Sequence, residues 1–215
     1  MSQRPANNFG IAFIFAVLLA IALGIVLLIF GKNETFQLIN GNHNEFGDRF
    51  FKYFTHYGDG LMWIPLGLVC FFYKRKYLIA VIAGIIISTL IAQLLKRVVF
   101  PDELRPINFL SDQFPVHLIN GVTMRKLNSF PSGHTTTAFT MALIMAHMIN
   151  NKFWSIVLII LAFLAGYSRI YLAQHFPTDV LAGICIGIIS ALLALMIYKH
   201  FQEKINGKVD PVRKS

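Results

Sequence analysis

The chain has 215 residues, of which 56% are apolar and only 13% are charged. Soluble domains carry roughly a quarter charged residues, so this composition argues against an ordinary soluble protein and predicts one compact domain embedded in a membrane. The net charge of +9 would suit nucleic acid, but basic residues that flank membrane spans explain it better, and no nucleic-acid partner is expected. Cys70 and Cys185 both lie in apolar runs and form no metal-ligand pair.

Long apolar runs recur along the chain, separated by polar segments, and we interpret six of them as transmembrane helices of an all-α bundle. The spans are placed at about 9–30, 60–73, 77–95, 132–149, 153–173 and 177–198. The first run is too long for a cleaved signal peptide and is expected to be retained. Residues 199–215 form a basic tail.

Two segments between the spans carry their own patterns. Residues 45–57 place five aromatic side chains at helical spacing with charged residues between them, which predicts an amphipathic helix lying in the membrane interface. A helix packed on the end of the bundle is an equal alternative. The connection 96–130 is long, basic and broken by three prolines, and loops of this length in compact proteins are usually functional.

The distribution of charge predicts the orientation. With the N-terminus inside, the inside segments hold ten basic and two acidic residues, against nine basic and eight acidic residues outside. Basic residues concentrate on the cytoplasmic side of membrane proteins, so both termini are expected in the cytoplasm. The short loops suggest a bacterial cytoplasmic membrane, with the outer side facing the periplasm or the exterior.

Polar clusters gather at one side of the predicted bundle. They are Lys96 at the end of span three, Ser132-Gly133-His134 at the start of span four, Arg169 near the end of span five, and His175 with Asp179 at the start of span six. With six spans, all four positions fall on the outer side. Ionisable residues at membrane depth are rarely incidental, so this convergence predicts a functional site.

The residue types in these clusters suit phosphate chemistry. His175 and Asp179 are four apart, one helical turn, so the carboxylate can fix the imidazole tautomer. Backbone N–H groups at the start of span four would form an anion site, where Gly133 permits close approach and Ser132 adds a hydroxyl donor. Of the two histidines, one can attack phosphorus and the other can protonate a leaving oxygen.

Permanent positive charge completes the predicted pocket. Lys96, Arg105 and Arg169 would hold phosphate oxygens, and guanidinium forks suit that task. A metal site built on the two histidines and the aspartate is the sharper rival. However, the surrounding cations would repel a divalent ion, and no dense carboxylate or cysteine set accompanies them. No metal and no other cofactor are therefore expected.

In their order, these pieces resemble the signature motifs of the type 2 phosphatidic acid phosphatase (PAP2) superfamily, whose membrane members are lipid phosphatases with six spans. The matching residues are Arg105-Pro106, Pro131-Ser132-Gly133-His134, and Ser168-Arg169 with His175 and Asp179. The second and third motifs match in full. The first departs from the family pattern, in which six residues separate a lysine from the Arg-Pro pair. Here eight residues separate Lys96 from Arg105 and seven separate Arg97 from it, so either cation is a candidate, and Lys96 is favoured.

The resemblance implies a role for each matching residue. His175 would be the nucleophile that forms a phosphohistidine, Asp179 would orient it, and His134 would protonate the leaving oxygen. The phosphoryl oxygens would be held by Lys96, Arg105, Ser132, Gly133 and Arg169. The expected activity is metal-independent hydrolysis of a lipid phosphate or diphosphate at the outer interface. Its candidate substrates are phosphatidate, phosphatidylglycerophosphate and isoprenyl diphosphates.

Three alternatives stay open at this point. A lipid phosphotransferase would pass the phosphoryl group from the same histidine to another lipid. A haloperoxidase-like use of the pocket with vanadate is disfavoured by the six spans, because those relatives are soluble. A non-catalytic transporter or scaffold is disfavoured because both motif histidines are present and the span interiors carry almost no charge. The sequence leaves the oligomeric state undetermined.

Overall fold

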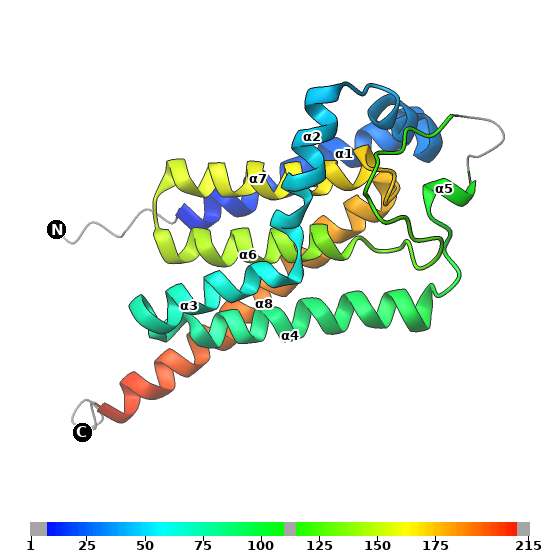
Figure 1. The fold of residues 1–215 in the computed structure, drawn as a ribbon. Coiled ribbons are helices and arrows are strands. Elements are labelled where there is room, and N and C mark those ends of the chain that lie inside the picture. Colours follow the sequence, from blue (N-terminus) through cyan, green and yellow to red (C-terminus); the bar gives the residue numbers. More distant parts are fainter. Residues whose placement is uncertain (1–7, 110–114, 210–215) are drawn as a thin grey trace.

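The computed structural model describes residues 8–109 and 115–209, and every regular element in these ranges is helical (Figure 1). The last part of the predicted tail, 210–215, lies outside the described residues. The α-helices are α1 (Asn8–Asn40), α2 (Glu45–Phe54), α3 (Trp63–Tyr73), α4 (Leu78–Leu94), α5 (Pro106–Phe109), α6 (Gly133–Ile149), α7 (Lys152–Tyr171) and α8 (Pro177–Val209). Short turns η1 (Thr55–Gly58), η2 (Gly60–Met62) and η3 (Arg75–Tyr77) are 3₁₀-helical, and η4 (Leu95–Val99) is a π-helical turn that extends α4.

Helix α6 is the centre of the bundle, because it packs against α1, α4, α7 and α8. Most of its side chains are buried. Two glycines of α8 bring their helix close to it: a Cβ at Gly183 would lie 2.8 Å from Ser132 O, and one at Gly187 would lie 2.7 Å from Phe139 Cβ. Small residues at helix contacts are how membrane helices approach closely, so this packing fixes where α6 and α8 begin relative to each other.

Within the part of the chain that the structure describes, four helical segments are long and apolar enough to cross a membrane: Phe9–Asn40, Arg75–Val99, Lys152–Tyr171 and Pro177–Ile205. The apolar helix Gly60–Tyr73 is shorter, and α6 has 17 residues. At about 1.5 Å per residue, α6 falls slightly short of a hydrocarbon core of about 30 Å. The all-helical class with apolar helices of spanning length is thus observed, whereas the count of six crossings stays a prediction.

Helix α1 continues further than the sequence suggests. We expected a span ending near Phe30, but the helix resumes beyond a kink at Gly31, where φ is 75°. Tertiary contacts hold the extension: Phe36 is fully buried, and the Asn40 amide donates to Tyr171 O at 2.8 Å. These partners lie far along the chain, so the polar local sequence does not reveal them.

Helix α2 corresponds to the predicted amphipathic segment, and it combines features of both alternatives. One face packs on the bundle end, where Phe51 lies 4.6 Å from the Tyr171 ring and a Cβ at Gly47 would meet Tyr171 Oη at 2.6 Å. The other face exposes Phe46 and Tyr53, at 77% and 71% of their surface. An interfacial location for this exposed aromatic face remains a prediction.

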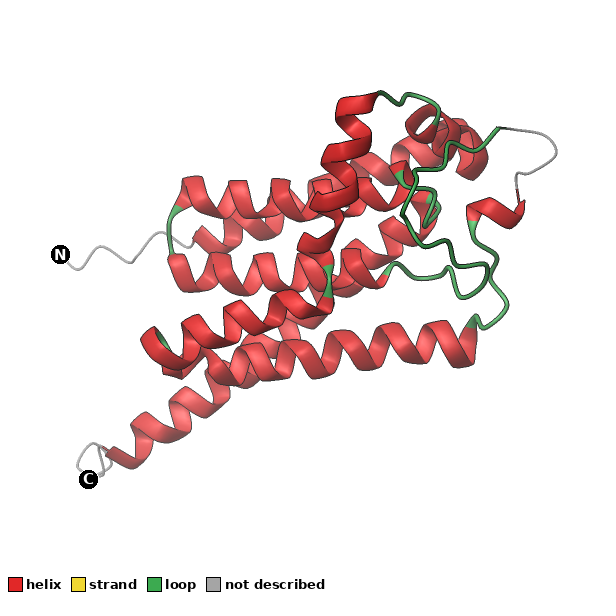
Figure 2. Cartoon of the chain, in the orientation of Figure 1, coloured by secondary structure: helices red, strands yellow, loops and turns green. Residues whose placement is uncertain are grey.

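The two ends of the bundle differ in construction. The start of α1 and the end of α8 lie toward one end, and the connection between α4 and α6 covers the opposite end together with α2 (Figures 1 and 2). Main-chain bonds close this connection on itself, from Arg105 N to Lys126 O at 3.1 Å and from Ser129 N to Glu103 O at 3.0 Å. The described parts of this connection therefore form a cover over one end of the bundle.

Candidate active site

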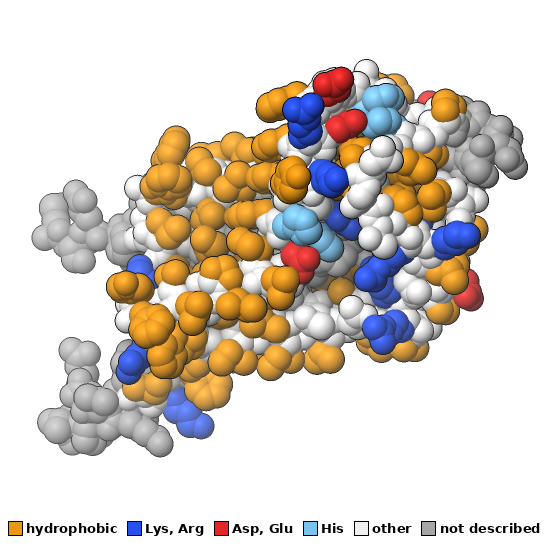
Figure 3. Space-filling view, in the orientation of Figure 1, with side chains coloured by type: hydrophobic (Ala, Val, Ile, Leu, Met, Phe, Trp, Pro, Cys, Tyr) orange, Lys and Arg blue, Asp and Glu red, His pale blue; other side chains and the backbone are white. Residues whose placement is uncertain are grey.

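A cavity of about 910 Å³ opens beneath this cover, and Figure 3 shows the hollow between basic and histidine side chains. Its walls come from α2, η1, η4, α6, the end of α7 and the long connection. Six of the eight predicted site residues line it: Lys96, Arg105, Gly133, His134, Arg169 and His175. The other two, Ser132 and Asp179, are buried behind the wall. The structure thus brings together residues from three separate motifs.

His175 and Asp179 form the predicted pair. His175 lies between α7 and α8, and Asp179 stands in the first turn of α8, which begins at Pro177. His175 Nδ1 lies 3.2 Å from Asp179 Oδ2. Because a carboxylate only accepts hydrogen bonds, Nδ1 carries the proton and Nε2 keeps its lone pair. The imidazole therefore offers a nucleophilic nitrogen on the wall of the cavity.

Asp179 is held by more partners than the sequence indicated. Its Oδ2 also accepts from Ser129 Oγ at 2.5 Å and from Phe176 N at 3.0 Å. Its carbonyl oxygen accepts from Ser132 N at 3.0 Å, which joins the start of α8 to the start of α6. Ser129 was missed because it precedes the recognisable motif and lies fifty positions from its partner. The network fixes the carboxylate that orients His175.

The end of α7 explains the spacing between Arg169 and His175. Arg169 O accepts from Gln174 N at 2.9 Å and from His175 N at 3.1 Å. The chain turns through Ala173, whose φ is 53°. A residue with positive φ reverses the chain at a helix end, so this turn directs both Arg169 and His175 toward the same cavity.

The Arg169 guanidinium is buried and only partly paired. Its Nη1 donates to Thr55 Oγ1 at 2.7 Å, and its Nη2 donates to Gln174 Oε1 at 3.4 Å. Its Nε has no hydrogen-bond partner among the residues that the structure describes. Buried donors are nearly always satisfied, so an unpaired guanidinium donor at a cavity wall fits an anionic ligand. Neither Thr55 nor Gln174 carries a sequence signal that predicts this contact.

Arg105 lines the cavity, but most of its guanidinium N–H groups donate hydrogen bonds to backbone carbonyl oxygens of the protein. It donates to Leu127 O at 3.1 Å, to Gln174 O at 2.7 Å and to Asn128 O at 3.3 Å. Burial, together with the charge of Arg125, lowers the pKa of Arg105 to about 10, so the group stays charged at neutral pH. Arg105 thus ties the cover to the residue before His175, and it adds positive charge to the cavity.

The two candidate cations of the first motif, Lys96 and Arg97, both line the cavity from η4. Lys96 is half-buried, whereas Arg97 is exposed. The π-helical turn contains one more residue per turn than an α-helix and so changes which side chains face inward at this point. Lys96 thus lies deeper than Arg97. This position favours Lys96 over Arg97 as the first-motif cation that would hold phosphoryl oxygens near His175.

The start of α6 supplies the backbone groups. Ser132 Oγ accepts from Thr135 N at 3.4 Å and from Thr135 Oγ1 at 2.8 Å, so this hydroxyl caps the helix. It is fully buried, and its predicted contact with phosphate stays a prediction. Gly133 and His134 line the cavity, and a Cβ built on Gly133 would meet nothing within 4 Å. The N–H groups of this helix end are thereby open to an anion.

Replacing Gly133 by alanine tests this arrangement. The added methyl group would stand in open cavity space, so we expect an unchanged unfolding temperature but a loss of about tenfold or more in kcat/KM for phosphate release. Gly67→Ala is the matched control, because a Cβ there also meets nothing within 4 Å and Gly67 lies in α3 away from the cavity. An unchanged kcat/KM in Gly133→Ala would exclude close approach of substrate to this helix end.

The protonation of His175 gives a second prediction. Burial lowers the pKa of His175 well below its usual range, and the charges of Arg105, Lys96 and Arg169 lower it further. The unfolded chain takes up a proton at this residue below about pH 6.5, whereas the folded protein does not. Proton uptake at His175 in the unfolded chain therefore lowers the free energy of unfolding as pH falls, by up to about 1.4 kcal/mol per pH unit.

We accordingly expect the free energy of unfolding in detergent to fall from pH 7 to pH 5 more steeply for the wild type than for His175→Asn. The two proteins share all other titrating groups, so the difference between their slopes reports His175. Thermal unfolding followed by circular dichroism at several pH values measures both slopes. Equal slopes would mean that His175 titrates alike in the folded and unfolded states.

The described residues contain no group of three or more histidine, cysteine, aspartate and glutamate side chains that could hold a metal ion. His175 and Asp179, the histidine and carboxylate that lie 3.2 Å apart at the cavity, stand beside the cations Lys96, Arg105 and Arg169. Divalent ions bind in proteins where several carboxylate, imidazole or thiolate ligands converge. The chemistry of the donor set here instead suits an anion.

The fold is an all-helical one with apolar helices of membrane-spanning length, and its cavity is lined by several cations and by an oriented histidine. The profile of the PAP2 superfamily matches residues 77–203. An undecaprenyl-diphosphatase of Sulfolobus acidocaldarius is 30% identical over 76% of this chain and 77% of its own length. Among solved structures, LpxE of Aquifex aeolicus is 34% identical with a TM-score of 0.69, over 77% of this chain and 94% of LpxE.

A PAP2-type phosphatidylglycerolphosphate phosphatase of Bacillus subtilis is also similar in structure, with a TM-score of 0.62 and 26% identity, over 90% of this chain and 95% of that one. The chain belongs to the PAP2 superfamily. It is a membrane enzyme of the PAP2 phosphatase type.

Proposed function

We propose that the protein hydrolyses a lipid phosphate or diphosphate through a phosphohistidine at His175. The observation that carries this proposal is the imidazole held by Asp179 at 3.2 Å on the wall of a strongly cationic cavity. Phosphoryl transfer needs a nucleophile, charge stabilisation of the phosphoryl oxygens and an acid for the leaving oxygen. The cavity offers a candidate for each part.

In the first step, the lone pair of His175 Nε2 forms a bond to phosphorus while the bond from phosphorus to the leaving oxygen breaks. The electron pair of that bond stays on the leaving oxygen. His134, which the negative charge of the bound phosphate would hold in its protonated form, supplies the proton and becomes neutral. Arg169, Lys96 and the N–H groups at Gly133 stabilise the negative charge on the phosphoryl oxygens. Asp179 stabilises the positive charge that develops on the His175 ring.

In the second step, water attacks the phosphohistidine and gives its proton to His134. The bond from phosphorus to Nε2 breaks, its electron pair returns to the nitrogen, and inorganic phosphate leaves. Both histidines are then in their starting states, so the cycle is balanced without a metal ion or an external reductant.

The location of the cavity supports action at a membrane surface. The elements that line it, among them η4, the start of α6 and the end of α7, lie away from the end of the bundle that holds the start of α1 and the end of α8 (Figure 1). This arrangement fits six crossings with both termini on the same side, in which α3 and α6 complete the four longer spans. The basic bias of the segments at the termini supports our proposal that the cavity faces the outer side of a cytoplasmic membrane.

The test is release of inorganic phosphate by the purified protein from phosphatidate, phosphatidylglycerophosphate, an isoprenyl diphosphate and a phosphorylated glycolipid. The undecaprenyl-diphosphatase of Sulfolobus acidocaldarius and a Porphyromonas gingivalis relative named lipid A 4'-phosphatase, 27% identical over 86% of this chain, motivate the last two substrates. We expect activity on at least one substrate, and we expect it to survive EDTA. No release from any of them would refute the proposal, and strong inhibition by EDTA would refute its metal-independent form.

A further inference from the structure

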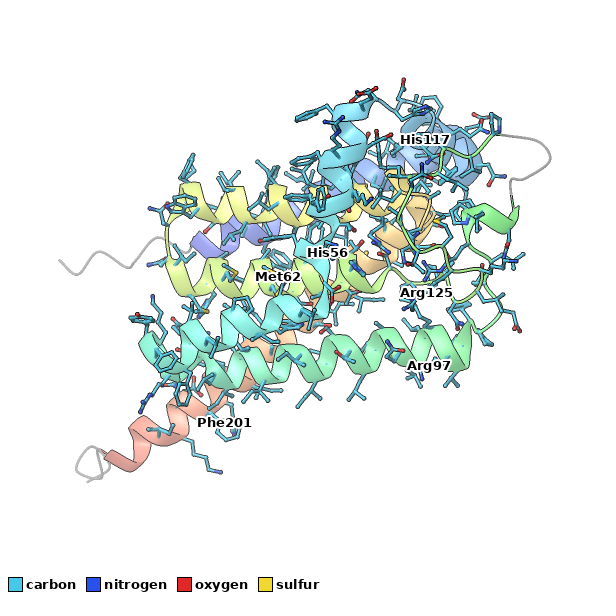
Figure 4. The ribbon with its side chains drawn as sticks, in the orientation of Figure 1. His56, Met62, Arg97, His117, Arg125 and Phe201 are labelled. Carbon is cyan, nitrogen blue, oxygen red and sulfur yellow. The ribbon has the colours of Figure 1, made fainter. Side chains whose placement is uncertain are left out.

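The cavity carries more positive charge than the inner site uses. Besides the inner cations Lys96, Arg105 and Arg169, three further basic side chains line it from three different elements. We call these three residues the basic rim: Lys52 of α2, Arg97 of η4 and Arg125 of the long connection. Figure 4 shows Arg125 on the connection and Arg97 at the end of α4, and both line the same cavity.

The rim is not neutralised by the protein within the described ranges 8–109 and 115–209. None of its three side chains forms an ion pair with a carboxylate there. The acidic residue on the cavity wall is Asp59, which lies 4.0 Å from His56. Cations gathered in one concave wall focus a positive potential into it, so the cavity attracts anions with more than one charge.

Two rim residues show how the rim is positioned. Lys52 Nζ donates to Asn120 O at 2.6 Å, and Gly121 packs so closely beside it that a Cβ would lie 2.8 Å from Nζ. Gly121 has a φ of 79°, which an L side chain rarely adopts. The charge of Arg125 reaches the inner site, because it lowers the pKa of Arg105. The rim and the inner cations therefore act on one shared volume.

The size of the cavity agrees with a ligand larger than one phosphate. Pockets of about 300–1,000 Å³ bury most of a drug-sized molecule, and this cavity has about 910 Å³. One phosphoryl group held at His175 by the inner cations would leave the rim and most of the volume without a ligand group. The remaining cavity volume and the rim cations that form no ion pair with a described carboxylate therefore lie in the same part of the cavity.

We infer that the basic rim binds a second phosphoryl group of the substrate, so that the preferred substrate carries two. This inference rests on the proposed phosphatase function. The two groups are either adjacent in a diphosphate or attached to separate positions of a head group. Guanidinium and ammonium groups can donate hydrogen bonds to the second phosphoryl group in either case, because each phosphoryl group presents several oxygens close together.

The two cases differ in which kinetic constant the rim controls. In a diphosphate, the terminal phosphorus bonds to His175 Nε2 and the bridging oxygen leaves with the other phosphate. The negative charge on that leaving phosphate increases as the bond breaks, so the rim would stabilise the transition state and raise kcat. A phosphate on a separate position keeps its charge throughout, so the rim would lower KM alone.

The experiment compares wild type, Arg97→Gln and Arg125→Gln as full-length purified protein in detergent micelles. The probes are farnesyl diphosphate against farnesyl phosphate, and a bis-phosphorylated glucosamine disaccharide lipid against its monophosphorylated form. Lys126→Gln is the matched control, since Lys126 is the exposed basic neighbour of Arg125 and does not line the cavity. The measured quantity is the ratio of kcat/KM for each substrate with two phosphates to kcat/KM for its partner with one.

We expect the wild type to prefer a probe with two phosphates, and each rim variant to lower that ratio about tenfold, while Lys126→Gln leaves the ratio unchanged. A fall in kcat on the diphosphate identifies adjacent phosphates, and a rise in KM on the disaccharide lipid identifies separate ones. An active wild type whose ratios do not change in the rim variants would overturn the inference. A wild type that releases phosphate from no probe would instead refute the proposed function.

Discussion

His175→Asn is expected to lower the rate of phosphate release by at least about 10⁴-fold, because it removes the attacking nitrogen. The side chain is 2% exposed and bonds to Asp179, and asparagine can keep a polar contact there without a nucleophilic lone pair. The loss should appear in kcat. Steady-state phosphate release, measured over a range of substrate concentrations, separates kcat from KM.

A phosphoenzyme assay makes this prediction specific for the nucleophile. Wild-type protein quenched during turnover of a radiolabelled substrate should retain label on the chain, and His175→Asn should retain none. His200→Asn is the matched control, because His200 is an exposed histidine on α8 at the opposite end of the bundle. A folded His175→Asn protein that keeps its label, or more than about one per cent of its activity, would transfer the nucleophile role to another residue.

The part of the site that the sequence predicts best is the part made by neighbours in the chain. Arg169, His175 and Asp179 lie within eleven residues, and one helix end, one turn and one helix start determine their relative positions. Local rules cover each of these: the helix period, proline at the first turn and a positive-φ residue at the helix end. The 3.2 Å contact between His175 and Asp179 agrees with that expectation.

Contacts between distant segments were not predictable in this way. Thr55 meets Arg169 across 114 positions, and Arg105 meets the carbonyl oxygen of Gln174 across 69. Neither contact leaves a periodicity or a motif in the sequence. The same limit explains the extension of α1, where Asn40 finds its partner 131 positions away. In each case, tertiary hydrogen bonds decide the structure of a segment whose local composition is polar and ambiguous.

Ser132 shows how one residue type can serve two purposes. A serine before a helix is both a possible phosphate donor and a common N-cap, and the sequence alone does not choose between them. In the structure its hydroxyl oxygen faces Thr135 and is buried, so its visible contribution is to the start of α6. That contribution still matters for the site, because it positions the N–H groups of Gly133 and His134.

Asp179→Asn is expected to have the second-largest effect on activity. The carboxylate accepts three hydrogen bonds at Oδ2, from His175, Ser129 and Phe176 N. An asparagine amide that directs its NH₂ toward the ring would favour the tautomer with the proton on Nε2, which leaves no lone pair for attack. In hydrolases with an Asp-His pair, the same change lowers kcat by about 10⁴-fold, and we expect a loss of about 10³- to 10⁴-fold here.

Ser129→Ala separates this effect on the tautomer from simple loss of stability. It removes one donor to Asp179 and leaves the carboxylate on His175, so we expect unfolding to become easier by about 1.5–3 kcal/mol while activity falls much less than in Asp179→Asn. Thermal unfolding and kcat for both variants in the same detergent make the comparison. If both variants lose stability and activity in the same proportion, Asp179 is a structural anchor. If Asp179→Asn loses activity far beyond its loss of stability, the carboxylate positions the nucleophile.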